Sequence, residues 1–267
     1  MDFTQIIYEK SDRIATITLN RPQVLNAYTA TMGAEIRRAL RGADTDDVVG
    51  ATIVTGAGRA YCAGADMADL ASRAGAHGED ERPVSAPSED VPPNLFSYMQ
   101  ALRKPVIGAL NGACVGIGFT SSLYFDIRIA AQNARMGLIF VQRGLAIEHG
   151  ASWMLPRLVG LGKAMEMAVT GRLVTAQEAL EMGLVNYVVP GDQLMGKARE
   201  VAGHIAHKCT PLGVAESKRS VYEHLFTDLT TATREDDELM RRMWKTADFK
   251  EGITAFREKR PPRFTGK

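Results

Sequence analysis

The stretch NGACVGIGFTSSLYFD, residues 111–126, leads from a predicted strand through glycines into an apolar helix. A second stretch, TGAGRAYCAGADMADL at residues 55–70, makes the same transition. Neither fits the GxGxxG dinucleotide fingerprint, because Tyr61 and Ser121 stand where the last glycine is needed. Each stretch alone is compatible with an ordinary strand-to-helix connection. Together, two such turns can aim two peptide N–H donors at one oxygen.

The flanking sequence predicts alternating strands and helices. Residues 5–8 and 13–19 are predicted to pair as strands, and 48–56, 104–112 and 126–131 are predicted to be short buried strands. This order favours an α/β fold with layered sheets and helices.

The predicted helices have recognisable ends and faces. Thr29 is a predicted N-cap for a helix with Met32, Ile36 and Leu40 on one face. From about residue 190 onward the chain is predicted to be almost wholly helical.

The composition excludes several classes of protein. The 267-residue chain is 45% hydrophobic and 24% charged, with a formal net charge of +1, which suits one globular domain without nucleic-acid or membrane partners. No apolar run approaches the ~18 residues of a membrane span, and the N-terminus has no signal-peptide pattern. Three widely spaced cysteines, Cys62, Cys114 and Cys209, without a CxxC motif indicate a reduced, cytoplasmic protein.

Residues 72–93 (SRAGAHGEDERPVSAPSEDVPP) break the alternation. They are rich in Gly, Pro, Ser and charge and offer almost no apolar anchors. They are predicted to form either a mobile lid over a binding site or a plain surface insertion.

Three motifs together resemble one family. AGAD at 63–66, VGIG at 115–118 and TGRLVTAQEALEMGLVNYVVP at 170–190 occur in the order and spacing of the crotonase (enoyl-CoA hydratase/isomerase) superfamily. The resemblance runs from about Ile14 to the C-terminal FREKRPPRF. It implies a crotonase (ClpP-like) spiral of ββα units in residues 1–195, which hold the CoA and acyl site. Residues 196–267 would then form a helical region that builds homotrimers, often paired into hexamers.

The resemblance also implies a substrate and its contacts. The substrate is an acyl-CoA thioester, with coenzyme A as part of the substrate, no permanently bound cofactor and no metal. The backbone N–H groups of Ala65 and Ile117 would hold the thioester carbonyl. The remaining residues that match positions at the CoA or acyl site are Val24, Ala27, Ala63, Asp66, Met67, Thr120 and Phe140, with Phe256 and Lys259 reaching the CoA of a neighbouring subunit. Asp66 is also predicted to cap the short helix that follows it.

The chain departs from the family's pattern at informative positions. Gln23 replaces a common lysine, which removes one phosphate contact, and Ile117 replaces a common glycine, which narrows the pocket. Thr120 and Phe140 occupy the positions of the two hydratase glutamates. Hydration by two glutamates is therefore not available to this chain.

Glu148, in RGLAIEHGASW, is the predicted base. It lies eight residues beyond Phe140, where some isomerases keep a single carboxylate and a dehalogenase branch keeps an aspartate, although Ile147 replaces the usual proline. An apolar acyl pocket would raise the pKa of such a carboxylate by desolvation. The alternative is an acidic residue that merely stabilises a helix start. His149 is a second candidate base, predicted to point away because adjacent side chains diverge on a helical turn.

Other candidate sites are weaker. Ser152 lacks the second glycine of a GxSxG elbow, and His204 and His207 are predicted to lie on a solvated helix face rather than to bind a metal. The favoured reaction is Δ3–Δ2 enoyl-CoA isomerisation through an enolate. Hydration or acyl-CoA hydrolysis with Glu148 alone activating water remains open, as does acyl-CoA binding without turnover.

Overall fold

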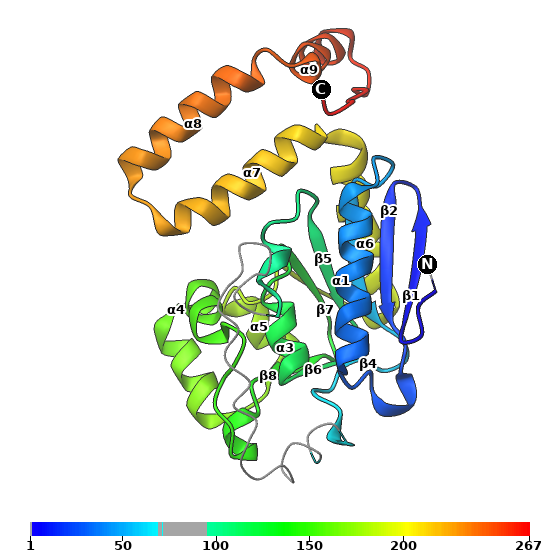
Figure 1. The fold of residues 1–267 in the computed structure, drawn as a ribbon, viewed down its shortest axis with the longest axis vertical. Coiled ribbons are helices and arrows are strands. Elements are labelled where there is room, and N and C mark those ends of the chain that lie inside the picture. Colours follow the sequence, from blue (N-terminus) through cyan, green and yellow to red (C-terminus); the bar gives the residue numbers. More distant parts are fainter. Residues whose placement is uncertain (1, 69–70, 72–94) are drawn as a thin grey trace.

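The central element of the fold is a six-stranded sheet. Figure 1 shows it in a computed structural model that describes residues 2–68, 71 and 95–267. Its strand order is β1-β2-β3-β5-β7-β10, in which β1 and β2 pair antiparallel and the other neighbours pair parallel. The strands are β1 (Ile6–Ser11), β2 (Ile14–Leu19), β3 (Ala51–Gly56), β5 (Val106–Leu110), β7 (Ile127–Ala131) and β10 (Tyr187–Val189). The five predicted strands are confirmed, as is the α/β fold class.

A second, four-stranded sheet carries the two glycine turns. Its order is β4-β6-β8-β9, where β9 is antiparallel and the others are parallel. The strands are β4 (Ala60–Cys62), β6 (Ala113–Val115), β8 (Arg135–Gly137) and β9 (Val174–Thr175). Because β4 and β6 are neighbours, the chain leaves the sheet at two adjacent points, after Cys62 and after Val115.

Strand residues of the six-stranded sheet alternate between two apolar clusters. On one face, side chains such as Ile53, Ile107 and Ile129 pack against Ala198 and Ala202 of α6 (Leu194–Lys208). The opposite face belongs to a larger core shared with α1 (Ala30–Thr45), α3 (Ile117–Ser122), α4 (Ala151–Thr170) and α5 (Ala176–Glu181). This two-sided burial is what a mainly parallel sheet requires.

The first helix forms as its sequence predicts. The Thr29 hydroxyl caps α1 by accepting a hydrogen bond from the Met32 N–H at 3.1 Å. Met32, Ile36 and Leu40 are buried against the large core. Each such buried side chain stabilises the fold by about 1.5–3 kcal/mol.

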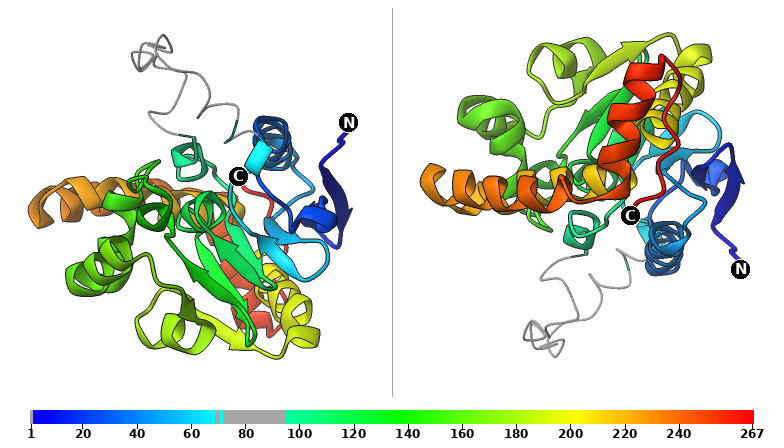
Figure 2. Two further views of the ribbon diagram at one scale, coloured as in Figure 1. Left: turned by 90° about the horizontal axis from the view of Figure 1, so that it is seen from below. Right: turned by 90° about the horizontal axis from the view of Figure 1, so that it is seen from above.

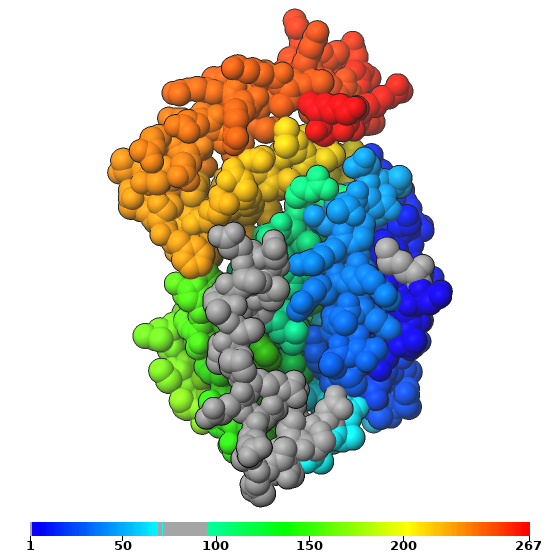
Figure 3. Space-filling view, viewed as in Figure 1, coloured from blue at the N-terminus to red at the C-terminus, as the bar shows by residue number. Residues whose placement is uncertain are grey.

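The C-terminal helices stand at one end of the molecule. α7 (Pro211–Glu223) and α8 (Leu229–Met243) are joined by a short 3-10 turn, and α9 (Ala247–Glu258) follows. Figures 1 and 2 show α8 on the side of α7 away from the sheet, and Figure 3 shows this region as a layer at one end. The helical prediction beyond residue 190 is confirmed. α6 crosses the predicted boundary at residue 195 and packs on the sheet, and the division into two regions stays a prediction.

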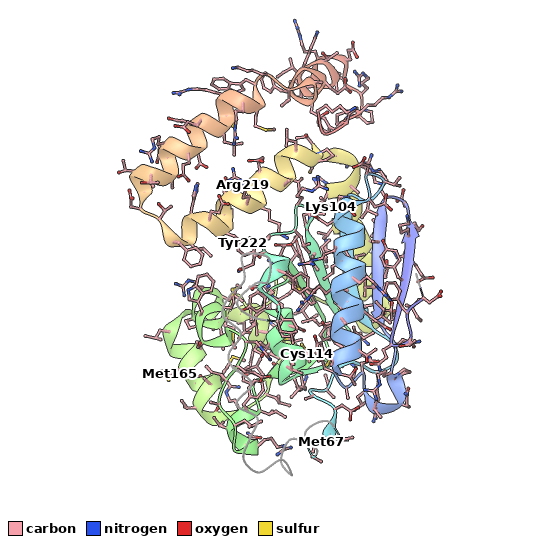
Figure 4. All side chains as sticks on the ribbon, in the orientation of Figure 1. Met67, Lys104, Cys114, Met165, Arg219 and Tyr222 are labelled. Atoms are coloured by element: carbon pink, nitrogen blue, oxygen red, sulfur yellow. The ribbon has the colours of Figure 1, made fainter. Side chains whose placement is uncertain are left out.

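A largely buried polar cluster attaches α7 to the sheet. The Lys218 Nζ donates to the Asp126 carboxylate at 2.8 Å and to the Met99 carbonyl at 2.9 Å. The Tyr222 hydroxyl donates to the other Asp126 oxygen at 2.9 Å, from the helix marked by Tyr222 and Arg219 in Figure 4. Beyond α7, the Phe226 ring stacks on Trp153 of α4 with 5.0 Å between ring centroids.

Within the described ranges, no helix combines the length and apolar character that crossing a bilayer requires.

Candidate active site

The two glycine turns lie in contact with each other. Gly64 follows β4 with φ of 120° and Gly116 follows β6 with φ of 56°, backbone conformations that favour glycine. A Cβ on Gly116 would lie 3.7 Å from the Cα of Gly64. The residues that follow these glycines, Ala65 and Ile117, are therefore brought together from positions far apart in the sequence.

The N–H groups of Ala65 and Ile117 are free within the described part of the chain. Tyr28 pairs with Ala65 as a parallel bridge. In this bridge the Tyr28 N–H donates to the Gly64 carbonyl and the Tyr28 carbonyl accepts from the Asp66 N–H, so the bridge does not use the Ala65 N–H. Ile117 is the first residue of α3, so its N–H has no acceptor within that helix. Two such donors can hold one developing oxyanion.

Two buried cysteines, Cys62 and Cys114, pack against the backbone of the glycine-rich segments. The Cys62 Sγ is 3.7 Å from the Gly64 carbonyl oxygen, and the Cys114 Sγ is 3.7 Å from that of Gly118. A Cβ on Gly118 would approach the Cys62 Sγ to 2.7 Å, so the third position of GIG must remain glycine for packing. Burial raises the pKa of the Cys62 thiol to about 11, which keeps it neutral. The chain's three cysteines are free thiols.

The RPQVLNA segment, residues 21–27, packs directly against the first glycine turn. Asn26 is fully buried, and its amide donates to the carbonyls of Ala57 and Ala60 at 2.9 and 2.8 Å. Leu25 and Asn26 both have positive φ, and the Leu25 carbonyl accepts from the Ala63 N–H at 3.0 Å. The turn leaves Val24 40% exposed and Ala27 half-buried, and their contact with CoA stays a prediction.

Asp66 joins the two segments. Its carboxylate accepts from the Ala68 N–H at 3.0 Å, which confirms the predicted cap, and pairs with the Arg21 guanidinium at 2.8 Å. Arg21 also donates to the Ala27 carbonyl at 2.8 Å. Met67 is 70% exposed at the end of the molecule opposite α9 (Figure 4). The Arg21–Asp66 pair was not predicted, since it joins residues 45 positions apart without a local pattern.

Thr120 and Phe140, which are predicted to stand where hydratases have two glutamates, are both buried. Thr120 lies one turn after Ile117 on α3 and is 0% exposed, and its hydroxyl has no partner among the described residues. Phe140 is 7% exposed and belongs to the same core as Ile117. The Ile117 side chain is 9% exposed, so most of it packs into the core.

Glu148 lies in the turn before α4. Ile147 packs on the large core, and the Glu148 carbonyl accepts from the Ala151 N–H at 3.0 Å. The Glu148 side chain is 42% exposed. The prediction that Glu148 lies in a desolvated environment is therefore wrong for the protein without substrate. The physical reason is local: residues 141–146, which lead into the turn, are exposed as well.

The prediction that His149 points away from Glu148 is also wrong. His149 Nε2 lies 3.6 Å from Glu148 Oε2. His149 has φ of 50°, and Gly150, which follows it, has φ of 75°. This left-handed backbone replaces the helical turn that the prediction assumed and turns both side chains to the same side.

Phe256 and Lys259 lie far from the glycine turns. α9 stands at one end of the molecule in Figure 1, and β4 and β6 lie toward the other. Phe256 is 86% exposed, and Lys259 ends α9 with φ of 53°. Within one chain these two residues do not join the candidate site.

The structure adds no support for Ser152, His204 or His207 as functional residues. Ser152 is exposed in the first turn of α4. His204 and His207 are exposed on α6, which confirms the solvated face, and His207 pairs with Asp12 at 3.1 Å. No group of three or more potential metal ligands occurs in residues 2–68, 71 and 95–267. The predicted lid, residues 72–93, lies outside the described residues.

Comparisons with known proteins agree with this fold and identify its family. The enoyl-CoA hydratase/isomerase family model matches residues 9–267. The chain is 34% identical to 1,2-epoxyphenylacetyl-CoA isomerase of Escherichia coli (strain K12) and 37% identical to a probable enoyl-CoA hydratase of Rhodobacter capsulatus, in both cases over 100% of each chain. Its fold is similar to the crystal structure of an enoyl-CoA hydratase from Bacillus anthracis, with a TM-score of 0.87, 33% identity and coverage of 99% of this chain and 100% of that one.

Proposed function

The chain belongs to the enoyl-CoA hydratase/isomerase family, and from that premise we propose that it isomerises Δ3-enoyl-CoA thioesters to Δ2-enoyl-CoA thioesters. Glu148 removes a proton from C2, the carbon next to the thioester carbonyl. The negative charge moves onto the carbonyl oxygen, which accepts hydrogen bonds from the Ala65 and Ile117 N–H groups. Glu148 then returns the proton to C4, and the double bond comes to lie between C2 and C3. Each such N–H donor typically lowers the barrier by ~3–4 kcal/mol.

The proposal is supported by two N–H donors that have no partner among the described residues, together with non-acidic residues at the two positions that the resemblance assigns to the hydratase glutamates. The turns after β4 and β6 supply the donors, and Thr120 and Phe140 are buried and cannot activate water as a carboxylate pair. Glu148 remains as an accessible carboxylate in the turn anchored by Ile147. An acyl chain bound beside it would exclude water, and desolvation makes a carboxylate a stronger base.

Hydration is the second candidate, because the Rhodobacter and Bacillus relatives are named enoyl-CoA hydratases. In that reaction Glu148 alone would activate the water that adds to C3. Product analysis separates the reactions: a 3-enoyl-CoA gives the 2-enoyl isomer in the first case, and a 2-enoyl-CoA gives a 3-hydroxyacyl-CoA in the second. Acyl-CoA binding without either product would indicate a non-catalytic role, and release of free CoA would indicate a hydrolase.

Replacing Glu148 tests the proposal. Glu148→Gln keeps the size and hydrogen bonding of the side chain but removes its basicity, so turnover of a 3-enoyl-CoA should fall by about 10²–10⁴-fold. Binding of the substrate, measured by calorimetry, should persist. Thr120→Ala is the matched control, since a hydroxyl is a poor base, and we expect far less loss. Wild-type turnover by Glu148→Gln would rule out Glu148 as the base.

We also propose that the protein forms a homotrimer or a hexamer. Phe249, Ile253 and Phe256 of α9 are 43%, 49% and 86% exposed, an apolar surface that association would cover. In such an assembly Phe256 and Lys259 would meet the CoA of a neighbouring chain. Sedimentation at micromolar concentration should show a trimer or hexamer, and a fully active monomer would contradict the proposal.

A further inference from the structure

An imidazole lies beside the proposed base. The 3.6 Å between His149 Nε2 and Glu148 Oε2 is just beyond hydrogen-bond length, and a small rotation of either side chain closes it. The His149 side chain is 31% exposed, compared with 42% for Glu148. The imidazole is therefore the more firmly enclosed of the two groups.

The backbone under His149 is strained and held in place. A φ of 50° is disfavoured for a residue with a Cβ, and such strain persists only where the surroundings enforce it. Here the Tyr124 hydroxyl, on a side chain only 2% exposed, donates to the His149 carbonyl at 2.7 Å. Gly150 continues the turn with φ of 75° and leads into α4.

The core also holds the His149 ring. It contacts the Phe96 ring edge to face, with centroids 5.6 Å apart and planes at 79°. Phe96 is 2% exposed, so this wall is part of the buried core. The position of the imidazole is therefore set from the core side, whereas the Glu148 side chain reaches toward solvent.

We infer that His149 is the positioning residue of Glu148, whose Nε2–H donates to one carboxylate oxygen so that the other faces C2 of the substrate. This inference rests on the proposed function, in which Glu148 is the base. Either the neutral tautomer protonated at Nε2 or the imidazolium can make this bond. His149 neither takes up nor releases a proton in the reaction; it limits the orientations that the Glu148 side chain can adopt.

Two amide variants test the contact. In His149→Gln the amide occupies the place of Nε2, whereas in His149→Asn it occupies the place of Nδ1 and falls short of Glu148. Asparagine tolerates a left-handed backbone, so the fold should survive, as an unchanged urea midpoint would show. We expect kcat for a 3-enoyl-CoA to fall by about tenfold or more in His149→Asn, in line with the loss of a hydrogen bond to a charged group. KM should change little, and His149→Gln should recover most of kcat.

A double variant separates this inference from the proposed function. If His149 acts only through Glu148, then Glu148→Gln with His149→Asn should be no slower than Glu148→Gln alone. His207→Asn is the matched control. His207, on the exposed face of α6, also lies beside a carboxylate, that of Asp12 at 3.1 Å. The kcat of this variant should equal that of the wild type. Wild-type kcat in His149→Asn, equal losses in both amide variants, or an additive double variant would overturn the inference. Full activity in Glu148→Gln would instead overturn the proposed function.

Discussion

The glycine turns and the C-terminal helices are held in different ways. Around Gly64 and Gly116, buried apolar residues such as Cys62, Phe119 and Leu138 belong to one large core. By contrast, no residue of α8, which is described in full, is buried, and Leu229 and Phe226 are 82% and 73% exposed. Dense packing fixes backbone donors to within fractions of an ångström, which oxyanion binding requires. The helices need only a few directional contacts to stay attached.

The largest expected effect concerns one of those contacts. Lys218→Met removes the cation that pairs with the Asp126 carboxylate, in a pair whose side chains are 6% and 14% exposed, and breaking a buried pair typically destabilises a protein by about 3–5 kcal/mol. Urea unfolding measures the change. Arg219→Met is the matched control on the same helix, because Arg219 pairs with Glu216 at the surface, where a pair contributes about 1 kcal/mol or less. Equal losses in both variants would mean that packing, not the buried pair, attaches α7.

The next effect concerns the turn after β6. The new Cβ in Gly116→Ala would meet no atom closer than an ordinary van der Waals contact, but the φ of 56° and ψ of −125° disfavour a Cβ, so the Ile117 N–H should shift. Loss of one oxyanion donor typically lowers kcat by about 10²–10³-fold. Gly162→Ala, in α4 and also without a close neighbour, should leave kcat unchanged. Undiminished kcat in Gly116→Ala would show that the turn does not place a catalytic donor.

The smallest effect depends on pH. Burial would raise the pKa of Asp248, but hydrogen bonds from the Thr210 hydroxyl and from the Thr265 and Gly266 N–H groups outweigh it and hold that pKa below its usual value. A depressed native pKa stabilises the fold above the unfolded pKa of about 3.9, and the contribution disappears as pH falls through the native pKa. Asp248→Asn should therefore lower stability by about 1 kcal/mol at pH 7. The difference from wild type should narrow below about pH 4. A constant difference from pH 7 to pH 3, measured by urea unfolding, would contradict this account.

Local patterns predicted much of the fold. Thr29 caps α1 as predicted, and the β1–β2 pair forms as predicted, with its turn at Asp12 and Arg13. The four-stranded sheet was not predicted, because its strands of two or three residues are too short for periodicity to show. The Lys218–Asp126 pair spans 92 positions, a separation that no local pattern reveals.

The site was predicted less completely than the fold. Glycines marked both turns, and the structure brings them into contact at Gly64 and Gly116. The orientation of His149 was missed, because it depends on a left-handed backbone at a residue that is not glycine. The exposure of Glu148 was missed, because it follows from the exposure of the whole segment 141–146 that leads into the turn. The Tyr124 hydroxyl that supports this backbone lies within an apolar run and gives no sequence signal.

The most direct test of the central claim is exchange of the C2 proton of a bound enoyl-CoA with D₂O, because exchange requires enolate formation but not product release. The wild type should show this exchange. In Glu148→Gln it should be slower by about 10²–10⁴-fold, with substrate binding retained. Exchange at the wild-type rate in Glu148→Gln would show that another group removes the proton and would contradict the account.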